Sequence, residues 1–229
     1  MIIGNGLIAT EFNKVHKDFK NYVVFAAGVS DSKEVRDEEF KREKDLILKT
    51  ISENPNLKFI YFSSILAEIV HNKYYLHNME MIELIKSKAK SYVIFNLPQI
   101  IGKTGNSNNL INYLRYNIKH CNTITIDKNV TRSLIDVEDV VKIVNHCKGE
   151  VDNEIVNISE IEKIDVISLA ERISDIIKPN ALFLSHKNGM EAIDEWEIEN
   201  SEIITNSIKY LGIEPKGYII RALKKYIKK

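Results

Sequence analysis

Two neighbouring tyrosines, Tyr74 and Tyr75, are the residues of this 229-residue chain that most suggest chemistry. They open a segment with helical spacing. A lysine four residues after a helical tyrosine lies on the same face and favours the tyrosinate, which makes the pair a general acid–base device. Tyr74 has Asn78 at that distance and Tyr75 has Met79, so neither register supplies the cation. We therefore expect a phenol that stays protonated at neutral pH.

Hydroxyl groups come shortly before the tyrosines. Ser63 and Ser64 end an apolar run that predicts a strand, and hydroxyls at a strand's carboxyl end often cap a loop. His77 is either a substitute acid or base, or a packing residue. The other histidines have no ligand spacing, which predicts no metal site.

A glycine turn, Gly4-Asn5-Gly6-Leu7-Ile8-Ala9, lies between a short apolar run and a segment with helical spacing. In that context glycines let the backbone approach a pyrophosphate, whose charge the helix N-terminus stabilises. The alternative is an ordinary tight turn. Ala26-Ala27-Gly28 ends the next apolar run, where small side chains leave room for a nucleotide or for close helix packing.

Strand and helix patterns alternate over the first hundred residues, which predicts an α/β fold with a parallel sheet covered by helices on both faces. The expected helices are 7–20, 38–53, 74–88, 112–119, 136–147, 165–177, 201–211 and 216–227, and the expected strands are 1–3, 22–27, 58–63, 92–97, 123–126 and 154–158. Beyond Pro98 the pattern loosens. We expect residues 1–98 and about 132–147 to form a Rossmann-like domain, and residues 99–131 and 148–229 to form a small substrate lobe.

Taken in order, these motifs resemble those of the extended short-chain dehydrogenase/reductases, which epimerise, dehydrate or reduce sugars attached to nucleotides. The motifs are the glycine turn, Ala26-Ala27-Gly28, Phe62-Ser63-Ser64, the segment 74–79, the segment 96–102 and the segment 132–140. The resemblance implies a shortened Rossmann-like sheet, NAD or NADP as cofactor and a nucleotide-sugar substrate. It places Gly4, Asn5, Gly6, Leu7, Ile8, Ala26, Ala27, Gly28 and Pro98 at the cofactor.

The same resemblance assigns side chains to the substrate. Asn108 and Asn109 match a segment that contacts the phosphates of the nucleotide sugar in relatives, although helix capping is an equal alternative. Arg132 matches an arginine that pairs with the diphosphate, for which a planar guanidinium is suited, and a plain ion pair is the alternative. The resemblance also implies a catalytic serine whose hydroxyl hydrogen-bonds the reacting sugar oxygen, and we place Ser64 before Ser63 in that role. Tyr75, or Tyr74, would lie near the sugar as well.

The chain also departs from this family. Relatives have two more strands between the glycine turn and the small-residue loop, and the first carries the acid that binds the adenosine ribose. Here Lys20 runs almost directly into Tyr22. Asp31 corresponds to this ribose-binding acid only if residues 22–27 form the second strand of the family's fold. Only one helix separates 22–27 from Phe62-Ser63-Ser64, which favours the alignment in which 22–27 is the later strand that leads into the small-residue loop. Asn96 stands where an arginine is usual, and the acidic pair of the dehydratases is absent.

Composition limits the partners. The chain has 32 basic and 32 acidic residues, so no net charge favours nucleic acid or an anionic membrane. No run approaches the ~20 apolar residues that span a bilayer, no secretory signal is recognisable, and Cys121 and Cys147 suit a reducing compartment. We expect a cytoplasmic protein. The resemblance implies a homodimer formed through the tyrosine helix and the helix before it.

These observations predict an NAD(P)-dependent nucleotide-sugar enzyme, a keto-sugar reductase or epimerase of surface polysaccharide synthesis. The alternative is a degenerate relative, weak or inactive in catalysis, that binds a nucleotide sugar or a partner subunit. The missing lysine and the missing strands favour that alternative. A third hypothesis is lysine-independent lyase or isomerase chemistry that uses His77.

Overall fold

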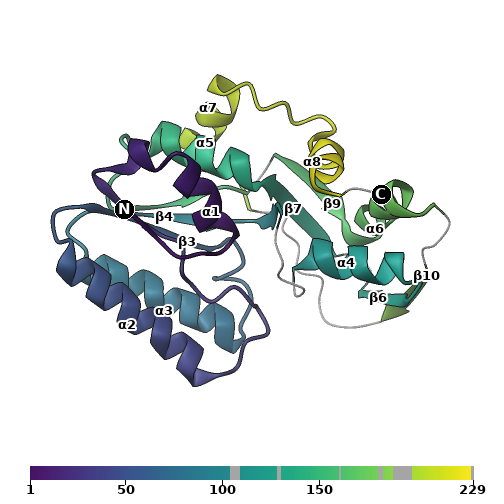
Figure 1. Cartoon of the computed structure of the whole chain (residues 1–229), viewed down its shortest axis with the longest axis horizontal. Helices are drawn as coiled ribbons and strands as arrows, with labels where there is room; N and C mark the ends of the chain where they lie inside the picture. The colour runs from purple at the N-terminus through teal and green to yellow at the C-terminus, as the bar shows by residue number, and fades with distance from the viewer. Residues whose placement is uncertain (104–108, 128–129, 160, 180–182, 188–197, 228–229) are drawn as a thin grey trace.

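A five-stranded parallel sheet forms the larger part of the protein, as a computed structural model shows (Figure 1). The structure describes residues 1–103, 109–127, 130–159, 161–179, 183–187 and 198–227. The strands, in their order across the sheet, are β1 (Ile2–Ile3), β2 (Tyr22–Phe25), β3 (Lys58–Ser64), β4 (Tyr92–Leu97) and β8 (Glu154–Asn157). Every neighbouring pair is parallel, which confirms the expected sheet.

The central strands are buried on both faces, which explains why their sequences are continuous apolar runs. Val24 and Ile60 belong to the core on one face, and Val23 and Phe59 to the core on the other. The first face is covered by α1 (Leu7–Lys14) and α5 (Val137–Cys147), and the second by α2 (Asp37–Glu53) and α3 (Lys73–Lys88) (Figure 1).

The connection through α1 differs in hand from the two that follow it. The connections through α1, α2 and α3 all move in one direction across the sheet, from β1 to β4. Because α1 lies on the opposite face from α2 and α3, its crossover has the opposite hand, although parallel crossovers are almost always right-handed. In the doubly wound fold the first helix leads to strands on the other side of the first strand, so the anomaly is explained if those strands are missing here.

A second body of mixed structure continues from the carboxyl end of β4. Pro98 alone separates β4 from β5 (Gln99–Ile101), which changes sheet and pairs with β7 (Thr131–Asp136). Antiparallel β9 (Glu162–Asp165) completes this three-stranded sheet. A separate parallel pair consists of β6 (Thr123–Asp127) and β10 (Phe183–Lys187).

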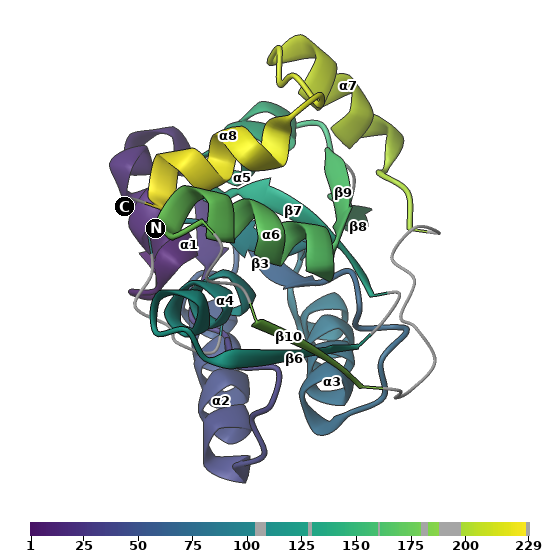
Figure 2. The same cartoon turned by 90° about the vertical axis from the view of Figure 1, so that its right-hand side faces the viewer.

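Helices pack around this second body (Figure 2). The core there gathers apolar side chains from α4 (Leu110–Lys119), α6 (Val166–Ile177) and α8 (Tyr218–Tyr226). The remaining helix, α7 (Glu202–Tyr210), packs instead against α5 on the large sheet.

The structure differs from the sequence-based expectations in several respects, and four of its strands, β5, β7, β9 and β10, were not expected. The helix expected over 7–20 ends at Lys14 and is followed by a 3₁₀ turn, η1 (His16–Phe19). Strand β8 lies in the range expected for the lobe but pairs with β4, and β7 lies in the range expected for the large domain but pairs with β5 and β9. Strand pairing therefore crosses the boundary between the two expected ranges. The sequence does not reveal this, because pairing between distant strands leaves no local pattern.

Candidate functional site

A row of polar side chains crosses the carboxyl edge of the large sheet. Ser63 on β3 is in register with Asn96 on β4, and Asn96 with Asn157 on β8. The Asn96 Nδ2 donates to Asn157 Oδ1 at 2.9 Å. Ser63 lies two residues after Tyr61, whose side chain belongs to the core under α2 and α3, so this row faces α3.

The sheet-facing stripe of α3 begins with Tyr74 and Asn78. Met81, Ile82 and Ile85 pack in the core under α3, and Asn78 lies one turn above them on the same stripe. Asn78 is 4% exposed. Tyr75 packs against the segment 65–67 that follows β3, and Tyr74 also reaches this segment, but only Tyr74 lies one turn before Asn78 on the stripe of Met81 and Ile82. Of the two sequence registers, Tyr74 with Asn78 is therefore the one that faces the row on β3 and β4.

Tyr74 is not activated as an acid–base group. Burial raises the pKa of its phenol to about 12, and the nearby Asn78 amide only partly opposes this. Lys73, the adjacent lysine, is directed away and binds Val35 O at 2.5 Å and Asp37 Oδ1 at 2.8 Å. The prediction that the phenol stays protonated at neutral pH agrees with this environment.

The two serines differ in their surroundings. The Ser64 Oγ accepts a hydrogen bond from Leu66 N at 3.2 Å, which is the loop-capping role that a hydroxyl at a strand end often has. The Ser63 Oγ is buried and has no hydrogen-bond partner. Ser63, which we placed second, is thus the serine whose hydrogen-bonding capacity is unused.

His77 belongs to a buried cluster centred on Glu43 of α2. The Glu43 carboxylate accepts from Tyr61 OH at 2.7 Å, from Val29 N at 2.8 Å and contacts His77 Nε2 at 3.2 Å. Burial alone would raise the pKa of Glu43, but the contacts with His77, Val29 and Tyr61 outweigh it and hold the pKa below its usual value. His77 therefore fixes α3 to α2.

Sequence reasoning did not identify Glu43, because it stands among many charged residues of α2. Its neighbour Arg42 donates to Ala27 O at 3.1 Å, so consecutive residues of α2 hold the small-residue loop after β2. A Cβ on Gly28 would lie 3.0 Å from the Glu43 Oε1. The loop Ala26-Ala27-Gly28 is thus shaped by α2, and the sequence signal that identifies it is the small size of its residues.

The two glycines of the N-terminal turn have different roles. Gly4 has φ +123°, and a Cβ there would lie 2.3 Å from Ala26 O, so the close approach of the two loops requires glycine. Gly6 is the N-cap residue of α1, and no atom lies within 4 Å of the position of its Cβ. No side chain caps this helix, so its first amide groups are available to an anion.

The other predicted cofactor residues surround this turn. Asn5 is exposed, Ile8 packs in the core, and Leu7 lies against the end of β5, where a Cβ on Gly102 would come within 2.7 Å of its Cδ1. Pro98 is buried between the two sheets. Leu7, in the glycine turn, therefore contacts the start of the second body at Gly102.

The predicted substrate residues are only partly placed at the site. Asn109 is the N-cap of α4 and accepts from Ile111 N at 2.9 Å, and Asn108 lies outside the described residues. Arg132 is the second residue of β7, where it is in register with Ile164 of β9 and donates from Nη1 to Thr131 O at 2.7 Å.

The adenosine side of a dinucleotide site lacks its supporting strands. Within the described part of the chain, no strand pairs with the outer edge of β1, and β2 lies between β1 and β3. Asp31, in the loop after β2, is thus on the wrong side of β1 for a ribose-binding acid. The glycine turn suits a diphosphate, but the residues present do not suit a whole dinucleotide.

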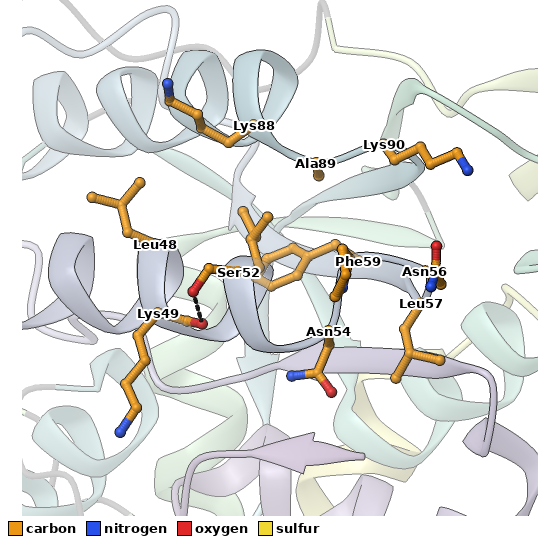
Figure 3. Close-up of a pocket in the computed structure, with 12 residues that line it drawn as sticks. Leu48, Lys49, Ser52, Asn54, Asn56, Leu57, Phe59, Lys88, Ala89 and Lys90 are labelled. Carbon is orange, nitrogen blue, oxygen red and sulfur yellow. Dashed lines mark hydrogen bonds between the residues drawn. The ribbon is translucent and has the colours of Figure 1, made fainter.

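A hollow in the surface lies away from this edge. It has a volume of about 720 Å³ and lies between the carboxyl ends of α2 and α3, with Ile51, Leu57, Phe59 and Ala89 among its apolar lining and three lysines at its rim (Figure 3). Phe59 is the second residue of β3, so this hollow lies at the amino ends of the strands, opposite the carboxyl edge. In the described ranges, no helix is long and apolar enough to cross a membrane, and no group of three or more His, Cys, Asp or Glu side chains could hold a metal.

No protein-family model matches the sequence, and no curated protein does. Solved structures match over most of the chain. UDP-glucose 4-epimerase from Thermotoga maritima, bound to UDP-glucose, has a TM-score of 0.70 and 17% identity, covering 96% of this chain and 80% of its own. RMD from Pseudomonas aeruginosa, bound to NADPH, has a TM-score of 0.67 and 15% identity, covering 90% and 80%.

UDP-N-acetylglucosamine 4-epimerase from Bacillus cereus has a TM-score of 0.61 and 16% identity, covering 97% of this chain and 82% of its own. At these identities the likeness shows the fold alone. The chain has the α/β fold of NAD(P)-dependent nucleotide-sugar epimerases, dehydratases and reductases, a Rossmann-like sheet with a small mixed sheet attached.

Proposed function

We propose that this protein binds a nucleotide sugar at the carboxyl edge of the large sheet and does so without a complete dinucleotide cofactor. The observation that carries the proposal is the strand order, because in the part of the chain that the structure describes no strand lies on the outer side of β1, where the adenosine would rest. In this proposal the sugar half of the site consists of Ser63, Tyr74 and Arg132.

The chemistry of these residues suits binding. The amide groups at the start of α1 and the Arg132 guanidinium both suit a diphosphate. Serine, tyrosine and asparagine side chains suit sugar hydroxyls. The phenol of Tyr74, with a pKa raised to about 12, serves as a hydrogen-bond donor at neutral pH and not as a base.

Calorimetric titration with UDP-glucose, dTDP-glucose, GDP-mannose and ADP-glucose tests this proposal. We expect at least one to bind with a micromolar dissociation constant, and Arg132→Met to weaken it about ten-fold, as the loss of a charge-assisted contact should. Arg115→Met, on the exposed side of α4, is the matched control and should not change affinity. Absence of binding by all four, in folded protein, would contradict the proposal.

A second candidate is an NAD(P)-dependent keto-sugar reductase or epimerase of surface polysaccharide synthesis. The open space at Gly6 and the uncapped N-terminus of α1 favour it, because they suit a pyrophosphate. It requires micromolar binding of NADH or NADPH. Lyase chemistry at His77 is not carried forward, since that side chain is 6% exposed and paired with Glu43.

A further inference from the structure

The hollow at the amino ends of the strands has the size of a small-molecule site. Its walls are the last turns of α2 and the residues at the end of α3, and Phe59 of β3 lies beneath them (Figure 3). Its volume of about 720 Å³ lies within the range of roughly 300–1,000 Å³ that is usual for ligand pockets.

The protein does not fully cover the apolar side chains of this hollow. Ile51, Leu57 and Ala89 pack on the core under α2 and α3 but stay partly exposed, as does Leu48 on the wall formed by α2. Because α2 and α3 both connect parallel strands, both helices end at this edge of the sheet, and the hollow lies between their ends. Burial of these side chains against an apolar group is therefore favourable.

Two polar side chains of the α2 wall are already used within that helix end. The Ser52 Oγ donates to Lys49 O at 2.8 Å, and the Asn54 Nδ2 donates to Thr50 O at 3.0 Å. These bonds complete the end of α2, and the charged groups of the hollow are left at its rim.

The rim is positively charged. Lys88 and Lys90 come from the end of α3, and Lys49 comes from α2 on the other side (Figure 3). The Lys49 Nζ lies 3.9 Å from the Glu53 Oε1 in an exposed pair. Among the described residues, no ion pair includes Lys88 or Lys90. Two cations without an acidic partner beside an apolar hollow attract an anion whose apolar part can enter it.

Other classes of ligand use only part of this arrangement. A sugar or a free phosphate leaves the apolar side chains in water, and a neutral hydrocarbon leaves the lysines unused. A nucleic acid needs a longer basic surface, and the chain has equal numbers of basic and acidic residues. A molecule with an apolar body and an anionic head uses both the floor and the rim.

We propose that this hollow binds a small amphipathic anion, a carboxylate that carries an acyl or aryl body. The apolar body lies against Leu48, Ile51 and Leu57, and the carboxylate lies near Lys88 and Lys90. This inference goes beyond the proposed function, because the hollow lies at the amino ends of the strands and the nucleotide sugar is proposed to bind at their carboxyl edge.

Two matched pairs of probes test the charge requirement in calorimetric titrations of the full chain. Decanoate is compared with 1-decanol, and 2-naphthoate with 2-naphthol, which is neutral at pH 7. We expect the anion of at least one pair to bind about five-fold more tightly than its neutral partner, the effect of two exposed ion pairs, and this preference to shrink in about 0.5 M salt. The pair that shows the preference distinguishes an acyl from an aryl ligand.

The double variant Lys88→Met, Lys90→Met provides the second readout. It should abolish the preference for the anion while binding of the neutral probe and the melting temperature stay unchanged, because both lysines are exposed. The variant Lys119→Met, Lys209→Met is the matched control. It removes two exposed lysines from α4 and α7, and it should keep the preference.

The position of the bound probe is tested by nuclear magnetic resonance. We expect the anion to shift the backbone amide signals of Leu57 and Ala89, which line the hollow. Leu48→Glu places a carboxylate on the wall and removes apolar surface, so it should abolish these shifts in a protein whose melting temperature shows that it is folded.

Several results would overturn the proposal. They are equal binding of the anion and its neutral partner in both pairs, a preference that survives the loss of Lys88 and Lys90, and amide shifts confined to the carboxyl edge. Binding of no probe up to about 1 mM would also overturn it. A dimer that Leu48→Glu dissociates, without binding of any probe, would assign the hollow to a second copy of the chain. None of these results bears on nucleotide-sugar binding, so the two proposals fail separately.

Discussion

Asn78 is the residue that most separates this protein from a tyrosine-dependent catalyst. It faces the same region as Tyr74 but supplies an amide where a cation would lower the pKa of the phenol. Burial then dominates, and the phenol is held as a neutral donor. A single substitution is expected to reverse this balance.

Asn78→Lys should lower the pKa of Tyr74 from about 12 by 1 to 3 units, roughly the effect of an opposite charge within 4–6 Å. Ultraviolet titration of phenolate absorbance, with Tyr74→Phe to assign the signal, measures it. Met79→Lys is the matched control, because position 79 is not on the stripe of Tyr74. An equal shift in both variants would show that the register assigned to α3 is wrong.

Glu43 makes stability depend on pH. Its pKa in the folded protein is below its usual value near 4.5, so its contribution is present above that value and is lost as the pH falls through the folded pKa. We expect Glu43→Gln to lower the free energy of unfolding by about 2 kcal/mol at pH 7 and by progressively less below pH 4.5. Urea unfolding from pH 3 to 7 checks this, and a constant difference would contradict it.

At the scale of elements, the two glycines of the N-terminal turn differ in how strictly the structure requires glycine. Gly4→Ala should cost more than about 2 kcal/mol, since φ is positive and a Cβ would collide with Ala26 O. Gly6→Ala should cost less than about 1 kcal/mol. Thermal unfolding of both variants tests the contrast, and similar losses would refute the distinction.

The central strands of the large sheet were predictable because they are buried on both faces and give uninterrupted apolar runs, as in Tyr22–Phe25. Its helices were predictable from the helical spacing of their apolar residues. The short strands β5 and β9 were not, since three or four residues carry too little pattern. The Tyr74 register depends on which stripe of α3 meets the sheet, and Glu43 depends on packing between α2 and α3. Neither is encoded locally.

At the scale of the whole molecule, α8 fastens the second body to the large sheet. Tyr218 OH donates to Asp139 Oδ2 at 2.7 Å and accepts from Asp136 N at 2.9 Å, while Lys225 and Tyr226 bind the Asp136 carboxylate at 2.9 and 2.7 Å. Asp136 is also the N-cap of α5. The start of α5, which packs on the large sheet, is thus bound by side chains of α8 from the second body.

Tyr218→Phe should lower the free energy of unfolding by about 1–3 kcal/mol, because it leaves Asp139 and the Asp136 amide without their partner. Urea unfolding measures the loss, and hydrogen exchange should locate it in α5 and α8. Tyr210→Phe, at an exposed position of α7, is the control. Equal effects of the two substitutions would show that α8 does not fasten the two bodies.

Among the described residues, the opposite hand of the first crossover and the unpaired outer edge of β1 both fit a doubly wound sheet without the strands that carry the adenosine. The central claim is therefore that the sugar half of the site functions without the dinucleotide half. A competition experiment tests it most directly. A nucleotide sugar that binds the purified protein is titrated alone and in the presence of 1 mM NADH or NADPH, with dinucleotide binding measured separately.

We predict micromolar binding of the nucleotide sugar, no change in its affinity with either dinucleotide, and no measurable binding of NADH or NADPH up to that concentration. Micromolar binding of either dinucleotide would contradict the account, because it would show that the glycine turn and the edge of β1 hold a whole cofactor.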